Sequence, residues 1–219
     1  MKILFYTTLA FTLITGCKEK PKSETNSKTH PTLSIAEKIA NAHGFKNWQY
    51  ISKIQFTFNK KRNWVWQPKN DSISLITEKD TINYFRKNID SLSFRADENF
   101  INDKFWLLIP FQLVWDKNTT ISQPLIEKAP ISQVIMNKIV LTYSNDSGGY
   151  TPGDAYDIYY NDDFLIKEWA FRKGNQPEPS LTNTFENYKN YNGLLLASDH
   201  KMLDSDWNLT LSNIKVILN

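Results

Sequence analysis

Alternation of apolar and polar residues predicts β-strands over much of this chain. Apolar and polar side chains alternate from Ile54 to Asn59, which is the period of a half-buried strand. Trp64-Val65-Trp66 repeats the alternation and places both tryptophans on one face. Further strands are expected at Ser72 to Thr77, Thr81 to Phe85, Lys138 to Ser144, Tyr156 to Tyr160, Phe164 to Arg172, Thr182–Lys189 and Leu209–Leu218. Polar turns separate these segments without a strand–helix–strand alternation, so the pattern favours an antiparallel meander.

One strand has an ambiguous inner face. In the segment 164–172, Ile166, Glu168 and Ala170 alternate with residues that include Trp169 and Phe171. The two large aromatic side chains favour the second set as the face toward the core.

A helical period of apolar residues predicts a short helix over Ile35–His43. Ser34 and Glu37 have the spacing of a capping box, which satisfies free backbone groups at a helix start. Gly44 supplies the left-handed residue that commonly ends a helix. His43, at the helix end, is expected to interact with the helix dipole rather than to act in catalysis.

A second helix is predicted from Asp97, as the capping residue, through Ile109, with Pro110 ending it. Its side chains are apolar on nearly every face, and apolar residues continue from Phe111 to Trp115. Such a segment is either buried on all sides or covers an apolar ligand. The polar segment 116–130 is expected to be a connection.

Composition indicates one folded domain without a nucleic-acid signature. The chain has 219 residues, of which 41% are apolar and 14% aromatic, which is enough to bury its own core. The net charge of +3 is too small to argue for a nucleic-acid partner. Beyond the N-terminal segment, no apolar run approaches the ~20 residues of a membrane span.

The N-terminal segment has the form of a secretory signal. Met1-Lys2 is a positively charged start, and residues 3–14 are mostly apolar. The following Thr15-Gly16-Cys17 resembles the lipobox of bacterial lipoproteins, whose signal peptide is cut before an acylated cysteine. This resemblance implies a signal peptide at 1–16 and lipidation of Cys17, the only cysteine in the chain. The alternative is an ordinary secretory signal in which Cys17 is incidental.

Residues 17–33 are expected to be a flexible tether between the lipid and a folded domain at 34–219. The segment from Lys18 to Thr32 has no large apolar side chain, so it cannot bury enough surface to order itself. In the sorting rule of enterobacterial lipoproteins, an Asp in the position of Lys18 retains the protein in the inner membrane. Lys18 therefore implies a protein anchored in the outer membrane of the cell envelope, facing either the periplasm or the cell surface.

The order of the predicted elements resembles the superfamily of lipoprotein carriers that includes LolA and LolB. The segments Asn102 to Pro110 and Gly149 to Tyr156 resemble an uncharacterised family of Gram-negative lipoproteins within that superfamily. The resemblance implies a mainly β (α+β) fold, in which a curled antiparallel sheet forms an unclosed half-barrel with a few covering helices. It also implies a cavity that holds acyl chains.

Two functions from different classes remain open. In the first, a hydrophobic, acyl-chain-like ligand binds in the half-barrel cavity, which five aromatic residues would line: Trp64, Trp66, Phe105, Trp106 and Trp115. Taken singly, each of these residues is better explained as an ordinary core residue, and the ligand hypothesis depends on the five together and on the apolar segment from Phe100 to Leu113. In the second, the protein is a glycan- or protein-interaction module with exposed aromatic platforms. A closed apolar cavity would favour the first function, and an exposed aromatic row the second.

The sequence offers no catalytic motif, so we expect a binding protein rather than an enzyme, monomeric and without cofactor or metal. Ser198-Asp199-His200 contains the residue types of a triad, but adjacent side chains of an extended chain point to opposite faces. The other histidines, His30 and His43, lie in the tether and at a helix end.

Overall fold

The computed structural model describes residues 32–145, 151–203 and 205–219. Within this part of the chain, Leu33–Asn219 form one compact unit. The predicted signal peptide, Cys17, His30 and nearly all of the tether lie outside the described residues, as does part of the segment from Gly149 to Tyr156.

The described strands form antiparallel pairs, as the sequence predicts. The first sheet has the order β13-β14-β1-β2-β3-β4. Its strands are β13 (Asp199–Lys201), β14 (Asn208–Leu218), β1 (Ile51–Phe58), β2 (Arg62–Gln67), β3 (Ser72–Ile76) and β4 (Thr81–Phe85). The two tryptophans of β2, Trp64 and Trp66, lie on the same buried face, as the alternation predicts.

The second sheet has the order β10-β9-β8-β7-β5, and β6 pairs with β7 beside it. Its strands are β10 (Leu181–Thr184), β9 (Ile166–Arg172), β8 (Ala155–Tyr160), β7 (Ile135–Tyr143), β5 (Thr119–Ile121) and β6 (Leu125–Lys128). A short ribbon of β11 (Lys189–Tyr191) and β12 (Leu194–Leu196) completes the strands. The segment 116–130, predicted to be only a connection, therefore contributes β5 and β6.

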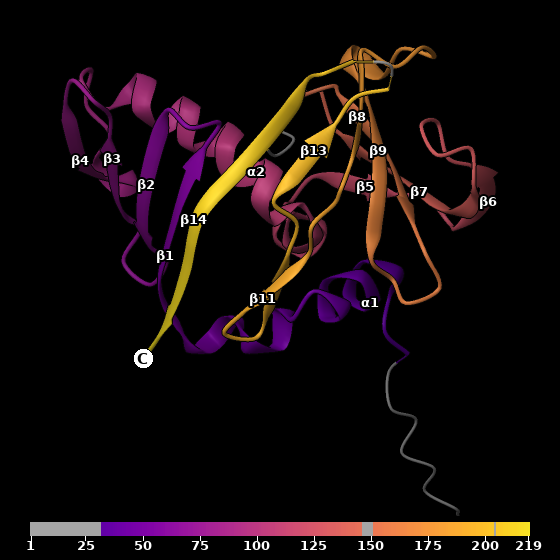
Figure 1. Cartoon of the computed structure of the whole chain (residues 1–219), viewed down its shortest axis with the longest axis horizontal. Helices are drawn as coiled ribbons and strands as arrows, with labels where there is room; N and C mark the ends of the chain where they lie inside the picture. Colours follow the sequence, from indigo (N-terminus) through magenta and orange to yellow (C-terminus); the bar gives the residue numbers. More distant parts are fainter. Residues whose placement is uncertain (1–31, 146–150, 204) are drawn as a thin grey trace, which may run out of the picture. The chain divides into compact units, whose positions relative to one another are not determined.

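The edges of the two sheets meet at β13 and β10. The amide of Glu186, just after β10, donates to the carbonyl oxygen of Asp199 at 2.9 Å, and the amide of Lys201 donates to Thr184 Oγ1 at 3.0 Å. The first sheet, from β4 to β13, and the second sheet are seen side by side in Figure 1. No described sheet closes into a barrel, and the predicted mainly β, antiparallel and unclosed fold is confirmed.

The first helix, α1 (Ile35–Ala42), has the predicted capping box. Glu37 donates its amide to Ser34 Oγ, and the Glu37 carboxylate accepts from the Ser34 amide at 2.8 Å. Gly44 follows with a φ of 93°, and a Cβ there would lie 1.9 Å from the carbonyl oxygen of Gly193. A side chain at Gly44 is therefore excluded by space as well as by backbone conformation.

The second helix, α2 (Phe94–Trp115), is longer than predicted. Ser93 rather than Asp97 precedes its first residue, and the prediction that Pro110 ends the helix is wrong. The helix continues past Pro110 with a local distortion at Leu108, where φ is −122° and ψ is 23°. A proline inside a helix removes one hydrogen bond and clashes with the preceding turn, so a kink there is the expected cost of continuing.

The burial of α2 explains why the helix continues past Pro110. Phe100, Leu108 and Phe111 belong to a core formed with the first sheet, whereas Phe105 and Ile109 belong to a core formed with the second. The helix passes behind the first sheet in Figure 1. Apolar contacts on both sides thus account for its nearly continuous apolar surface. None of the described helices combines the length and apolarity needed to span a membrane.

A bulge in β9 resolves the ambiguous inner face. Tyr159 pairs with Glu168 but Tyr160 pairs with Ile166, so Lys167 is an extra residue in the strand. The bulge breaks the alternation, and Ile166 joins Trp169 in the second core. The preference for the Trp169 set is therefore correct only beyond the bulge.

The C-terminal part of the chain differs from prediction in its short strands. β10 ends at Thr184 rather than running to Lys189, and β11 to β13 are strands of only three residues that alternation does not reveal. β14 matches the predicted final strand within one residue. Three 3₁₀ helices, η1 (Phe45–Tyr50), η2 (Arg86–Asn88) and η3 (Lys173–Asn175), connect elements of the described chain.

Candidate functional site

An open hollow of about 250 Å³ lies where α2 ends beside the first sheet. We call it the Trp hollow, after three tryptophans in its wall. Its lining residues are Trp48, Trp66, Pro68, Asp71, Arg86, Lys104, Gln112, Trp115 and Asp116. They come from η1, the end of β2, the turn after it, η2 and α2, so folding of the whole N-terminal half is needed to assemble the hollow.

The three tryptophans of the hollow form one aromatic wall. The ring centroids of Trp48 and Trp115 are 4.5 Å apart with an edge-to-face orientation, and those of Trp48 and Trp66 are 5.6 Å apart. Phe111 packs behind them, 5.8 Å from Trp48 and 5.5 Å from Trp115. Edge-to-face packing holds the rings in place, so the wall is preformed.

Lys104 extends from α2 over this wall. Its Nζ lies 5.7 Å from the centroid of Trp66 and 5.9 Å from that of Trp115, which are cation–π distances. Among the described residues, no hydrogen-bond acceptor or carboxylate lies within bonding distance of this ammonium group. Burial lowers the pKa of Lys104, and the nearby Arg86 charge lowers it further, against the opposing effect of Asp116 and Asp71.

Gln112 lies two turns after Lys104 on the same row of the helix. Its side chain is almost completely buried, with 3% exposure, and its Oε1 has no hydrogen-bond partner among the described residues. A buried amide oxygen without a partner is costly, because it has lost its water without gaining a donor. The hollow therefore contains both a cation and an acceptor that the described protein residues leave unmatched.

The other charged groups of the hollow have partners. Arg86 Nε donates to Asp97 Oδ1 at 2.8 Å, and Trp66 Nε1 donates to Asp71 Oδ1 at 3.2 Å. Asp116 accepts a hydrogen bond from the hydroxyl of Tyr143. Burial raises the pKa of Asp116, while this hydrogen bond and the charge of Lys104 act in the opposite direction.

The five aromatic residues predicted to line one cavity are distributed over different places. Trp66 and Trp115 line the Trp hollow. Trp64 is a core residue with 1% exposure, and its Nε1 donates to Asp103 at 2.8 Å. Phe105 and Trp106 line a different hollow on the second-sheet side of α2. The structure thus brings together only two of the five in a hollow of mixed polarity.

The hollow beside Phe105 and Trp106 is smaller and mostly apolar. Its volume is about 180 Å³, and we call it the apolar hollow. Its lining residues are Asn102, Phe105, Trp106, Thr151, Tyr156, Trp169, Phe171 and Leu181.

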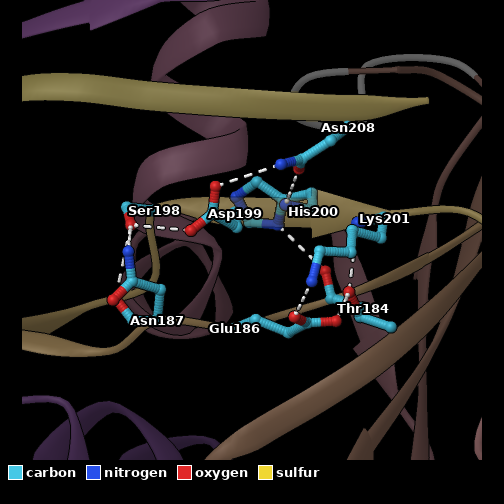
Figure 2. A network of polar contacts seen from close by, with 8 residues as sticks. All are labelled: Thr184, Glu186, Asn187, Ser198, Asp199, His200, Lys201 and Asn208. Carbon is cyan, nitrogen blue, oxygen red and sulfur yellow. Dashed lines mark hydrogen bonds and ion pairs between the residues drawn. The ribbon is translucent and has the colours of Figure 1, made fainter. Parts of the chain in front are cut away.

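A polar network occupies the junction of the two sheets (Figure 2). Ser198 Oγ donates to Asp199 Oδ2 at 3.3 Å and accepts from Asn187 at 2.7 Å, and Asn208 donates to Asp199 Oδ1 at 3.2 Å. Lys201 Nζ pairs with Glu186 at 2.6 Å. These contacts connect the loop after β10 with β13 and β14, and they give the network a structural role.

His200 does not form a triad with Ser198 and Asp199. Its Nδ1 contacts the carbonyl oxygen of Thr184 at 3.1 Å, and its ring packs edge-to-face on Trp106 and Phe185. Burial lowers the pKa of His200 to about 4, so the ring is neutral at pH 7. No group of three or more acidic, histidine or cysteine side chains suited to a metal ion occurs among the described residues.

Sequence reasoning missed Trp48, Lys104, Gln112, Arg86 and Asp71. A signal for two of them exists in the helix period, because Phe100, Lys104, Leu108 and Gln112 repeat every four residues. Two polar residues on an otherwise apolar row suggest a site. The other three residues come from separate turns and 3₁₀ segments, whose proximity no local pattern reveals.

No protein-family model, curated protein or solved structure matches this chain. The resemblance to the lipoprotein-carrier superfamily therefore stays a prediction.

Proposed function

We propose that the folded domain is the binding module of a lipid-anchored cell-envelope protein, and that its Trp hollow binds a single sugar-sized ring. The observation that carries this proposal is the unpartnered Oε1 of Gln112 beside a preformed wall of three tryptophans. Ligand sites typically combine apolar and aromatic walls with a few convergent polar groups. Of the functions predicted from sequence, this corresponds to the glycan-binding alternative.

The size and opening of the hollow favour a small, flat ligand. Its volume of about 250 Å³ lies just below the range of roughly 300–1,000 Å³ typical of drug-sized ligands. A sugar ring has an apolar face that stacks on indole and hydroxyl groups along its edge. Those hydroxyls match the acceptors Gln112, Asp71 and Asp116.

Titration of the folded domain with a panel of monosaccharides, followed by the indole N–H signals in NMR spectra, tests this proposal. We expect the signals of Trp48, Trp66 and Trp115 to shift, and a Trp115→Ala variant to bind at least several-fold more weakly. Trp207→Ala is the matched control, because Trp207 is partly exposed and lies outside both hollows. Equal loss of binding in both variants, or no shift with any sugar, would contradict the proposal.

The apolar hollow supports a second candidate function, the binding of a hydrophobic, acyl-chain-like ligand. Six of its lining side chains are aromatic or aliphatic, among them Phe105, Trp106 and Trp169. Titration with a fluorescent fatty acid tests this candidate. Binding that is lost in Trp106→Ala and retained in Trp115→Ala would assign the ligand to the apolar hollow.

The membrane anchor is part of the same proposal. Each buried methylene contributes ~0.8 kcal/mol, so two or three acyl chains on Cys17 would hold the protein stably in a bilayer, as we propose for the outer membrane. Cells given a clickable fatty acid should label the wild-type protein but not Cys17→Ala. Equal labelling of both would show that Cys17 is not the acylated residue.

A further inference from the structure

We infer that the ring bound in the Trp hollow carries a carboxylate, and that the ammonium group of Lys104 receives it. The ligand class is then an acidic sugar rather than a neutral one. This inference depends on the proposed function and specifies its ligand.

The state of Lys104 is the first observation in support. Its ammonium group lies over two tryptophan rings without an acceptor among the described residues, although burial is the largest influence on its pKa. Lys104 is partly exposed, so water solvates part of this charge and a ligand carboxylate can replace that water. The cation–π contacts with Trp66 and Trp115 stabilise the ammonium group at this position, and a ligand carboxylate would supply an acceptor.

Arg86 is the second observation. Its guanidinium group lines the same hollow, and its Nε and Nη2 donate to Asp97 at 2.8 Å and 3.4 Å. The Asp97 carboxylate thus pairs with Arg86 and leaves Lys104 without a partner. The carboxylates of Asp71 and Asp116 line the same hollow, so the attraction for a ligand carboxylate is local to the Lys104 ammonium group rather than a net charge of the hollow.

The acidic residues of the hollow are consistent with this ligand. Asp71 already accepts from Trp66 Nε1, and Asp116 already accepts from Tyr143. Their remaining oxygens, like Oε1 of Gln112, are acceptors suited to ligand hydroxyl groups. The hollow therefore offers a cation for one carboxylate and several acceptors for hydroxyls, which is the combination that an acidic sugar presents.

D-glucuronate and D-glucose are the probes that test this inference, because they differ only in the carboxylate that replaces the terminal hydroxymethyl group. Indole N–H shifts at neutral pH and low salt give both affinities. A hydrogen bond to a charged group changes an equilibrium constant by roughly tenfold to a hundredfold. We therefore expect glucuronate to bind about tenfold more tightly than glucose. Acetate, which has the carboxylate without a ring, should bind more weakly than glucuronate.

The Lys104→Met variant removes the ammonium group and retains an unbranched apolar stem. It should lose the preference for glucuronate over glucose, whatever its affinity for glucose, whereas Lys104→Arg should keep most of that preference. Lys167→Met is the matched control, since Lys167 Nζ also lies 5.7 Å from an aromatic ring, that of Tyr188, but outside the hollow. Thermal unfolding of each variant verifies that it folds.

The outcomes separate this inference from the proposed function. Equal binding of glucose and glucuronate, unchanged in Lys104→Met, overturns the inference and leaves sugar binding intact. Acetate binding as tight as glucuronate binding also overturns it, because the hollow would then be a simple anion site. Failure of both sugars to bind overturns the inference, and failure of the whole monosaccharide panel overturns the proposed function as well.

Discussion

Two neighbouring residues of α2, Asp103 and Lys104, place a charge in opposite environments: the first is fully buried and the second is partly exposed. Asp103 is fully buried and accepts four hydrogen bonds: from Arg62 Nε at 2.6 Å, Arg62 Nη2 at 2.7 Å, Trp64 Nε1 at 2.8 Å and Asn102 Nδ2 at 2.9 Å. Lys104 lines the Trp hollow, where its Nζ lies over two tryptophan rings, and its nearest charges, among them Arg86 and Asp116, act on it without an ion pair. Asp103 connects α2 to β2, whereas Lys104 makes no hydrogen bond or ion pair with a described residue.

The difference separates groups that hold the fold from groups available to a ligand. Buried charges are normally paired because an unpaired one is costly. Glu168, in the second sheet, follows this rule, since it accepts the amides of Ile131 and Ser132 at 2.7 Å and 2.9 Å. In the Trp hollow, by contrast, the buried Oε1 of Gln112 has no partner among the described residues and the partly exposed Lys104 makes no ion pair, which is why the Trp hollow is the favoured site.

The largest expected effect comes from truncating the packed side of α2. Phe105 has 1% exposure and contacts the rings of Tyr143, Tyr156 and Trp169, so Phe105→Ala should lower the free energy of unfolding by ~3–5 kcal/mol through cavity creation. Trp115→Ala, on the hollow side, should cost only ~1–2 kcal/mol, because Trp115 is partly exposed to solvent in the folded state. Urea unfolding of both variants measures the difference, and equal costs would show that Trp115 belongs to a closed core.

Breaking the Asp103 contacts should have the next largest effect. Asp103→Ala leaves Arg62 and Trp64 Nε1 without their acceptor, and we expect a loss of about 3 kcal/mol in the free energy of unfolding. The partial exposure of Arg62 to solvent keeps this figure at the lower end for a buried pair. Asp103→Asn, which retains an acceptor for Trp64, should lose less. A loss below 1 kcal/mol in Asp103→Ala would refute the structural role of these contacts.

Two buried histidines predict a loss of stability in mild acid. Burial lowers the pKa of His43 and of His200 to about 4, against 6.5 for the free side chain. Between these values the unfolded chain binds more protons, so stability falls as pH decreases from 6.5 toward 4. Each histidine should contribute at most about 2 kcal/mol between pH 7 and pH 5. Urea unfolding at both pH values measures the loss, which should be roughly halved in His200→Gln. An equal free energy of unfolding at pH 7 and pH 5 would show that both rings are protonated in the folded protein.

The elements that sequence predicted correctly are those governed by local chemistry. The capping box of Ser34 and Glu37 and the alternation of Trp64 and Trp66 concern neighbours along the chain, and both appear as expected. His43 does lie at the helix end, but its buried ring acts there as a neutral hydrogen-bonding group on the carbonyl of Ile39. Burial, which sets its protonation state, depends on tertiary contacts absent from the local pattern.

The failures have tertiary causes. Pro110 does not end α2, because packing against two cores outweighs the lost hydrogen bond. Because the bulge at Lys167 interrupts the alternation of side chains in β9, a regular two-residue pattern does not identify the inner face of this strand. The candidate site shows the same limit: aromatic residues were identified by type, but only the fold separates Trp66 and Trp115 from Trp64 and brings Lys104 to them.

The smallest expected effect, and the sharpest test of the comparison, is that of Lys104→Met on stability. The substitution removes the cost of partly desolvating an ammonium group and loses two cation–π contacts worth roughly 0.5–1 kcal/mol each. These effects oppose one another, so the free energy of unfolding at pH 7 should change by less than about 1 kcal/mol. Urea unfolding of Lys104→Met beside Asp103→Ala measures both neighbours under the same conditions. A loss near 3 kcal/mol in both variants would show that Lys104 is held as firmly as Asp103, and the hollow would then lose the unpartnered cation on which its assignment as an acidic-sugar site depends.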